Sequence, residues 1–108
     1  MLSYDRAYQC YCLVKDSQHA VARRELFRKA VAYAHLRANW MLATREERLE
    51  MDQHRTLAHN AFIDACNILS RAMATDEDNT WRAVLGDDRK IIGDFACYLH
   101  CFLGIEGR

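Results

Sequence analysis

The fold is decided by residues 44–74, which read TREERLEMDQHRTLAHNAFIDACNILSRAMA. Thr44 and Glu47 form a capping-box pattern, in which each side chain accepts a hydrogen bond from the other residue's backbone N–H at a helix start. Apolar residues then recur every three or four positions, the spacing of one helix face. The pattern predicts a long helix to about residue 74, with Asp52 as a point where it could break and be capped again. Its predicted core stripe comprises Met51, Ala58, Phe62, Ala65, Leu69 and Ala72, widened by Ala61, Cys66 and Met73.

Residues that interrupt helices are almost absent from the chain. It contains no proline, and its four glycines begin only at Gly86. Because glycine and proline break regular structure most strongly, their absence favours helices joined by short turns. The other expected helices are 4–14 (capped by Ser3), 18–42 (apolar stripe Phe27, Val31, Ala34, Ala38 and Met41), 81–85 (stopped by Gly86) and 88–103 (capped by Asp87 or Asp88, ended by Gly104).

These elements predict an all-α fold, a compact bundle of four main helices and one short helix. The bundle is either closed within one chain or completed by dimerisation. Residues 1–104 form a single helical domain in this interpretation, and residues 105–108 form a C-terminal tail. The tail, Ile105-Glu106-Gly107-Arg108, matches the cleavage sequence of the blood-coagulation protease factor Xa and is either native or appended.

The composition is that of a folded chain without a dominant charge. Apolar residues make up 51% of the chain, and 15 basic residues balance 15 acidic ones. No global field therefore draws the chain toward nucleic acid or an anionic membrane. The five cysteines come with neither a secretory leader nor an apolar run of about 18 residues, so we expect a cytoplasmic protein with reduced thiols.

The last predicted helix is apolar on most of its surface. Opposite its core face lies a row of small residues at i, i+4 and i+8, which would let another helix approach closely. This row consists of Gly93, Cys97 and Cys101. The pattern supports two interpretations: the helix is the central rod of the bundle, or the row is a self-association surface. The core face comprises Ile91, Ile92, Phe95, Leu99, Phe102 and Leu103.

A polar stripe lies opposite the core stripe of the helix at 44–74. An apolar residue, Ile63, projects among its polar ones, as is typical of a recognition patch. The alternative is a plain solvent-exposed face. The stripe comprises Asn60, Asp64, Asn67 and Arg71.

No catalytic motif and no cofactor site emerges from the sequence. Glu50 and His54 are four residues apart and share a helix face, so with His35 they are the best candidates for a metal or acid–base site. Cys97 and Cys101 beside His100 are a second metal candidate, but structural zinc requires two further ligands. Both groups have a plainer interpretation, as a partly buried histidine and as small core filler.

Basic residues gather in the second predicted helix, where Arg24 and Arg28 line one flank and Lys29 lies further round. The sequence between Lys15 and Leu42 contains six basic residues and only two acidic ones. Such a row could bind phosphates, which makes nucleic acid an alternative partner. The favoured interpretation is that this flank pairs with the acidic residues Glu46, Glu47 and Glu50.

The sequence therefore favours a small, non-catalytic helical interaction or regulatory protein. It would bind a protein partner, or itself, stoichiometrically, as an inhibitor or adaptor from a mobile element does. A nucleic-acid-associated regulator and a metal-binding helical-bundle enzyme are the two alternatives. No membrane association is expected.

Overall fold

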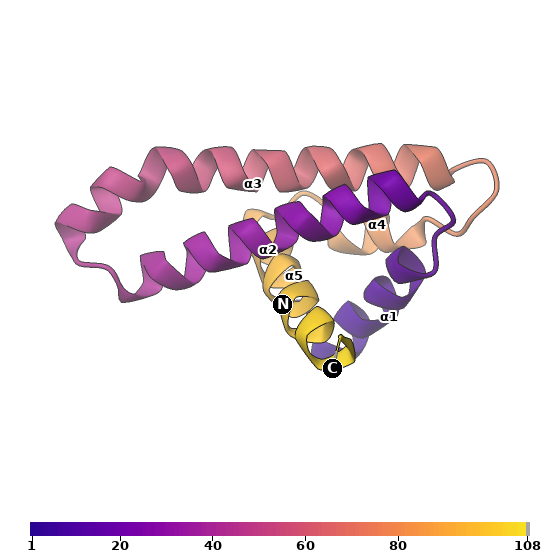
Figure 1. The fold of residues 1–108 in the computed structure, drawn as a ribbon, viewed down its shortest axis with the longest axis horizontal. Helices are drawn as coiled ribbons and strands as arrows, with labels where there is room; N and C mark the ends of the chain where they lie inside the picture. The colour runs from indigo at the N-terminus through magenta and orange to yellow at the C-terminus, as the bar shows by residue number, and fades with distance from the viewer. Residues whose placement is uncertain (108) are drawn as a thin grey trace.

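Five helices follow one another in the computed structural model, which describes residues 1–107 (Figure 1). No strand occurs within these residues, and the all-α prediction is confirmed. The helices are α1 (Tyr4–Lys15), α2 (Ala20–Leu42), α3 (Arg45–Met73), α4 (Thr80–Leu85) and α5 (Arg89–Glu106). None of the helices in residues 1–107 has the length and apolar character that a bilayer span requires.

The helix starts are capped largely as the sequence predicts. The Ser3 side chain accepts a hydrogen bond from the Arg6 N–H, and Asp88 caps α5. At Thr44 the capping box is complete: the Glu47 N–H donates to Thr44 Oγ1 at 3.2 Å, and the Thr44 N–H donates to Glu47 Oε1 at 2.8 Å. From this start α3 continues for 29 residues, so it neither breaks nor recaps at Asp52. These local signals are sufficient to define where most helices begin.

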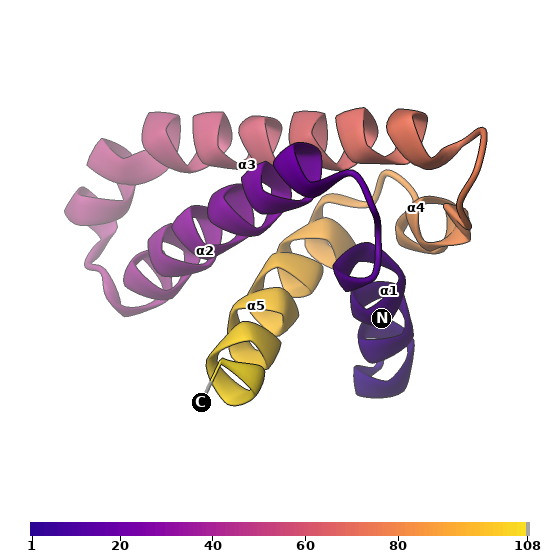
Figure 2. The same ribbon diagram turned by 45° about the vertical axis from the view of Figure 1, so that its right-hand side comes forward.

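The two longest helices form an antiparallel hairpin that extends beyond the rest of the molecule (Figures 1 and 2). Only Ala43 and Thr44 separate α2 from α3. The other three helices gather beneath the half of the hairpin that is distant from this turn (Figure 2). Their shared core is built around fully buried aromatic and aliphatic side chains: Tyr11, Leu26, Phe62, Leu69, Trp81, Phe95, Leu99 and Phe102.

The buried face of α2 differs from the predicted one. Ala34 is buried as expected, but Ala38 is exposed and the Met41 side chain is 67% exposed. Because α2 carries apolar residues on several sides, its own sequence does not select one face, and packing against α3 and α5 decides. The buried set is Leu26, Ala30, Tyr33 and Ala34.

Helix α5 does not end at Gly104, as was expected, but continues to Glu106. Its last turn is held by α1: Tyr8 and Tyr11 donate hydrogen bonds to the Glu106 carboxylate at 3.0 and 2.7 Å. The Lys15 ammonium lies 3.6 Å from the same carboxylate. These tertiary contacts outweigh the weak helix preference of glycine. The hydrogen bond from Tyr11 is the main cause that lowers the pKa of Glu106.

The lowered pKa of Glu106 predicts a specific acid sensitivity. Its ionised form stabilises the fold above the ordinary carboxyl pKa, and this stabilisation is lost as the pH falls through the lowered value. Glu106→Gln should therefore reduce the loss of unfolding free energy between about pH 5 and pH 3. Urea denaturation across this range tests it, with Glu46→Gln as the control because Glu46 forms no ion pair within residues 1–107. If the free energy of unfolding of Glu106→Gln fell as steeply with pH as that of the wild type, the lowered pKa of Glu106 would be wrong.

Candidate functional site

A groove of about 680 Å³ runs between α2 and α3. We call it the α2–α3 groove. Its walls are built mainly from alanine, together with two larger apolar side chains, Val21 and Ile68, that are 73% and 53% exposed. Small residues on both helices keep the walls low, so a shallow apolar channel remains open. The groove is lined by Ala20, Val21, Ala22, Ala61, Ala65, Ile68 and Ala72, with His19, Glu25, Lys29 and Asp64 as its polar members.

A second groove, of about 700 Å³, lies between α2 and α5. The members of the predicted small-residue row differ in their exposure. Gly93 is buried, and a Cβ at this position would lie 2.9 Å from the Arg37 guanidinium carbon. Its close neighbour is thus α2 of the same chain, which fits the interpretation of α5 as a packed rod. Cys97 and Cys101 line the groove and are accessible, beside Met41.

Arg37 of α2 lines this second groove and contacts α5. Its guanidinium lies 2.9 Å from the Asp94 carboxylate and donates a hydrogen bond to Cys97 Sγ at 3.7 Å. The side chains of Arg37 and Asp94 are about three-quarters buried, at 23% and 24% exposure. An ion pair this sheltered is screened less by salt than a surface pair.

The side chains of the predicted polar stripe of α3 have different surroundings. Asn60 and Arg71 are exposed, but Ile63 packs partly against the core. Asn67 Oδ1 accepts a hydrogen bond from Arg82 Nε at 2.8 Å, so its side chain holds α4 against α3. Asp64 lines the α2–α3 groove. The four polar residues share one face of α3, as their spacing predicts, but their side chains contact different neighbours, and a recognition role for this face stays a prediction.

The proposed metal ligands are not brought together either. Glu50, His54 and His35 are exposed and belong to no cluster of three potential ligands. His35 instead faces His100, with ring centroids 4.8 Å apart. The plainer interpretation, a partly buried histidine, does not hold for His54, which is exposed, whereas His59 is buried. Its ring packs edge-on against Tyr33, and desolvation lowers its pKa.

The one cluster of three potential metal ligands within residues 1–107 joins two loops at the end of the hairpin opposite the turn. His19 Nε2 lies 3.5 Å from Asp76 Oδ1 and 3.9 Å from Glu77 Oε2. The carboxylates are already engaged, because Ser17 Oγ donates to Glu77 at 2.8 Å and the Gln18 side chain donates to Asp76 at 2.7 Å. The cluster ties the α1–α2 loop to the α3–α4 loop. No pattern in the sequence indicated that these two loops meet.

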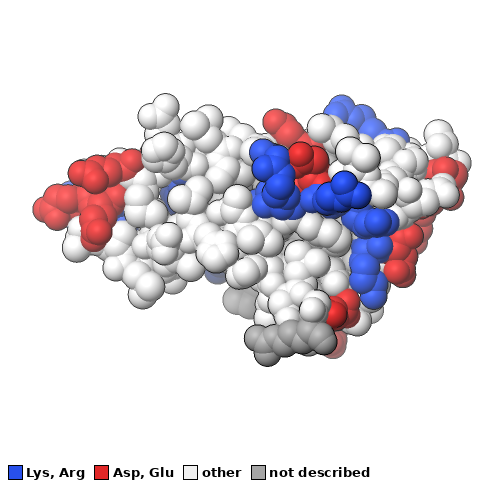
Figure 3. Space-filling model, in the orientation of Figure 1, with Lys and Arg blue, Asp and Glu red and all other residues white. Residues whose placement is uncertain are grey.

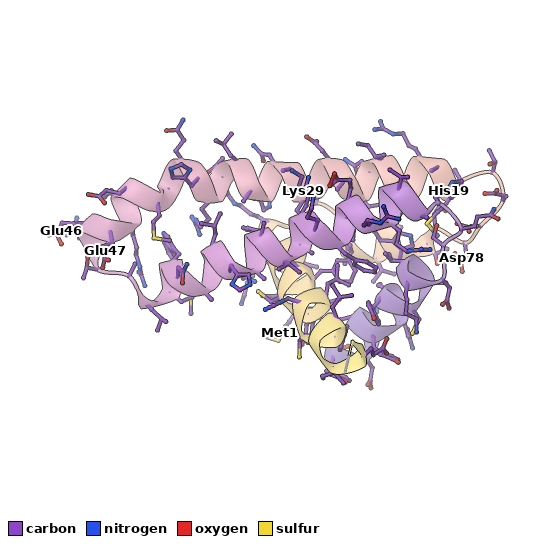
Figure 4. The ribbon with its side chains drawn as sticks, in the orientation of Figure 1. Met1, His19, Lys29, Glu46, Glu47 and Asp78 are labelled. Carbon is purple, nitrogen blue, oxygen red and sulfur yellow. The ribbon has the colours of Figure 1, made fainter. Side chains whose placement is uncertain are left out.

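The basic residues of α2 do not pair with the acidic residues at the start of α3, and that interpretation is wrong. Arg28 binds its own helix neighbour Glu25 through two hydrogen bonds, of 2.9 and 3.0 Å. Figure 4 shows why: Glu46 and Glu47 lie at the far tip of the hairpin, whereas Lys29 lies near its middle. Arg24 is exposed and Lys29 is half-buried at the groove.

Trp40 stiffens the tip of the hairpin. The guanidinium carbons of Arg48 and Arg55 lie over its ring, 4.2 and 4.3 Å from the ring centroid. Arg48 also donates hydrogen bonds to the carbonyls of Trp40 and Met41, which are among the last in α2. Carbonyl groups in the last turn of a helix otherwise have no hydrogen-bond donor within the helix.

The chain matches no protein family, and no curated protein or solved structure is significantly similar to it.

The two glycines within α5 provide a matched pair for testing the packing at Arg37. Open space surrounds the position of a Cβ at Gly104, so Gly104→Ala should stabilise the protein by about 0.5–1 kcal/mol through helix propensity. Gly93→Ala should stabilise it less, or destabilise it, because the Arg37 guanidinium must move away from Asp94. Thermal and urea denaturation measure both effects. A larger gain at Gly93 than at Gly104 would contradict the described contact.

Proposed function

We propose that this protein acts without catalysis, by stoichiometric binding of a protein partner through the α2–α3 groove. The observation that carries the proposal is the apolar groove itself, with Val21 and Ile68 exposed on opposite walls. Contiguous exposed apolar surface rimmed by polar residues is characteristic of interaction sites. Low walls of alanine suit an α-helix, because a helix laid in a groove inserts larger side chains between small ones.

The polar residues of the groove support the same proposal. Lys29 and Asp64 offer one positive and one negative group at its rim, which would orient a bound segment. The proposed mode of action is that of a regulator, inhibitor or adaptor, in which occupying the groove blocks or bridges a partner.

The proposal includes a reducing, cytoplasmic setting. All five cysteines are free thiols. Free thiols are typical of proteins that work where glutathione and thioredoxin keep cysteines reduced.

A glutamate placed in the groove should abolish partner binding and leave the fold intact. Ile68→Glu puts a charge on the apolar wall, and we expect recovery of a stoichiometric partner to fall at least tenfold. The measurement is affinity purification of the tagged full-length chain from its source cells, with mass spectrometry comparing the same partner between variants.

Ile105→Glu is the matched control, because Ile105 is similarly exposed, at 60%, but lies at the end of α5. It should recover as much partner as the wild type. Circular dichroism confirms that both variants remain helical. Equal recovery of the partner by Ile68→Glu and the wild type would overturn the proposal.

A further inference from the structure

A histidine and two carboxylates meet where the α1–α2 loop contacts the α3–α4 loop. His19 Nε2 lies 3.5 Å from Asp76 Oδ1 and 3.9 Å from Glu77 Oε2, and the donor atoms of the three residues lie within 4.8 Å of one another. We call these three residues the loop cluster. Because its members come from segments that are distant in the sequence, the loop cluster forms only when the chain folds.

The His19 ring nitrogen that lies near the carboxylates has no hydrogen-bond partner within residues 1–107, although it is shielded from solvent. Buried polar atoms normally have a partner, and one that has none requires an explanation. His19 also occupies the N-cap of α2, where a side chain usually accepts a hydrogen bond from the helix backbone, but its side chain accepts none. The ring is thus positioned toward the carboxylates and not toward its own helix.

Neighbouring hydrogen bonds orient both carboxylates and leave a lone pair on the oxygen nearest His19. The Gln18 side chain donates to Asp76 Oδ2 at 2.7 Å, and the Gln18 backbone N–H donates to Glu77 Oε1. Glu77 Oε2 accepts one hydrogen bond, from Ser17 Oγ at 2.8 Å, and a carboxylate oxygen has two lone pairs. Outer hydrogen bonds of this kind are the ones that fix the orientation of metal ligands.

The two loops carry negative charge that other side chains compensate little. Residues 16–19 and 74–79 contain four acidic residues and neither lysine nor arginine. Figure 3 shows acidic side chains at this right-hand end of the molecule, with basic ones beside them. Within residues 1–107, however, Asp76 and Glu77 form ion pairs only with His19.

The basic residues that flank the first of these loops in the sequence have other partners. The Lys15 ammonium lies 3.6 Å from the Glu106 carboxylate, and Arg23 donates a hydrogen bond to the backbone carbonyl of Ser17. Neither residue forms an ion pair with the loop cluster, so the local field favours a cation from solution.

We propose that the loop cluster binds one Zn²⁺ ion through His19 Nε2, Asp76 Oδ1 and Glu77 Oε2. A tetrahedral zinc ion with bonds of about 2.0–2.2 Å holds its ligand atoms about 3.3–3.6 Å apart. The separation of 3.5 Å between His19 and Asp76 meets this requirement, and the other separations, of at most 4.8 Å, shorten by side-chain rotation as the ion draws the carboxylates together. Water fills the fourth position.

The donor set decides the class of metal. Mg²⁺ and Ca²⁺ take oxygen ligands, whereas an imidazole nitrogen beside carboxylates suits Zn²⁺. The ion ties the α1–α2 loop to the α3–α4 loop, and it stabilises the fold because its ligands are assembled only in the folded chain. This inference goes beyond the proposed function and does not depend on it, since zinc binding is measured without a protein partner.

Zinc titration of the full chain tests the proposal. Isothermal titration calorimetry should detect a Zn²⁺ ion that binds at the loop cluster, and Zn²⁺ at about 100 times its dissociation constant should raise the melting temperature by roughly 10 °C relative to EDTA. His19→Ala should weaken this binding by more than about 100-fold, because loss of a ligand costs more than loss of an outer partner. Asp76→Asn should weaken it at least about tenfold, since a neutral amide replaces a charged ligand. Both side chains are partly exposed, at 31% and 45%, so both variants should fold.

The difference in melting temperature between zinc and EDTA separates a metal site from a simple ion pair. A protonated His19 held between two carboxylates would stabilise both samples equally and would give no difference. His100→Ala and Cys101→Ser are the matched controls, because these exposed side chains belong to the other candidate group of metal ligands. Both controls should retain the zinc-dependent rise.

A wild type whose melting temperature does not rise with zinc would overturn the inference. So would a rise that persists in both His19→Ala and Asp76→Asn, or one that the control substitutions abolish, when circular dichroism shows each variant to be helical.

Discussion

The architecture depends on the short turn between α2 and α3. Only Ala43 and Thr44 connect the two helices, and the capping box at Thr44 fixes the direction in which α3 leaves. Helices of 23 and 29 residues are thereby forced to lie side by side. At 1.5 Å per residue they reach about 35 and 44 Å, close to the 47 Å long axis of the molecule.

The remaining helices are too short to cover such a hairpin. They comprise 12, 6 and 18 residues and pack beneath one half of it. Apolar side chains on the rest of α2 and α3 therefore stay exposed, including Met41, Leu49 and Leu57. The groove between α2 and α5 reaches into this less covered half, at Ala38 and Met41, whereas the α2–α3 groove lies at the other end of the hairpin, at residues 19–29 and 61–72.

The sequence was most informative where a structural feature depends on neighbouring residues. The caps at Ser3, Thr44 and Asp88 were predicted correctly because each is a contact over two or three positions. Prediction failed where contacts between distant segments determine which face of a helix is buried or where a helix ends. The buried face of α2 is selected by two packing partners, and α5 passes through Gly104 because Tyr8 and Tyr11 bind its last turn.

The candidate site shows the same difference between features set by neighbouring residues and features set by distant segments. Cys97 and Cys101 of the predicted small-residue row line the groove between α2 and α5, and Asp64 of the predicted polar stripe lines the α2–α3 groove. The α2–α3 groove itself was missed, although Ala61, Ala65 and Ala72 on its α3 wall belong to the predicted core stripe, because a groove depends on how two helices pack together. Likewise His59, rather than His54, is buried, and its ring packs against Tyr33 of α2, a contact between segments distant in the sequence.

The stacking of Arg48 and Arg55 on Trp40 has a consequence for recognition. Two long side chains and the end of α2 are ordered before any encounter, so their conformational entropy is lost during folding and not on association.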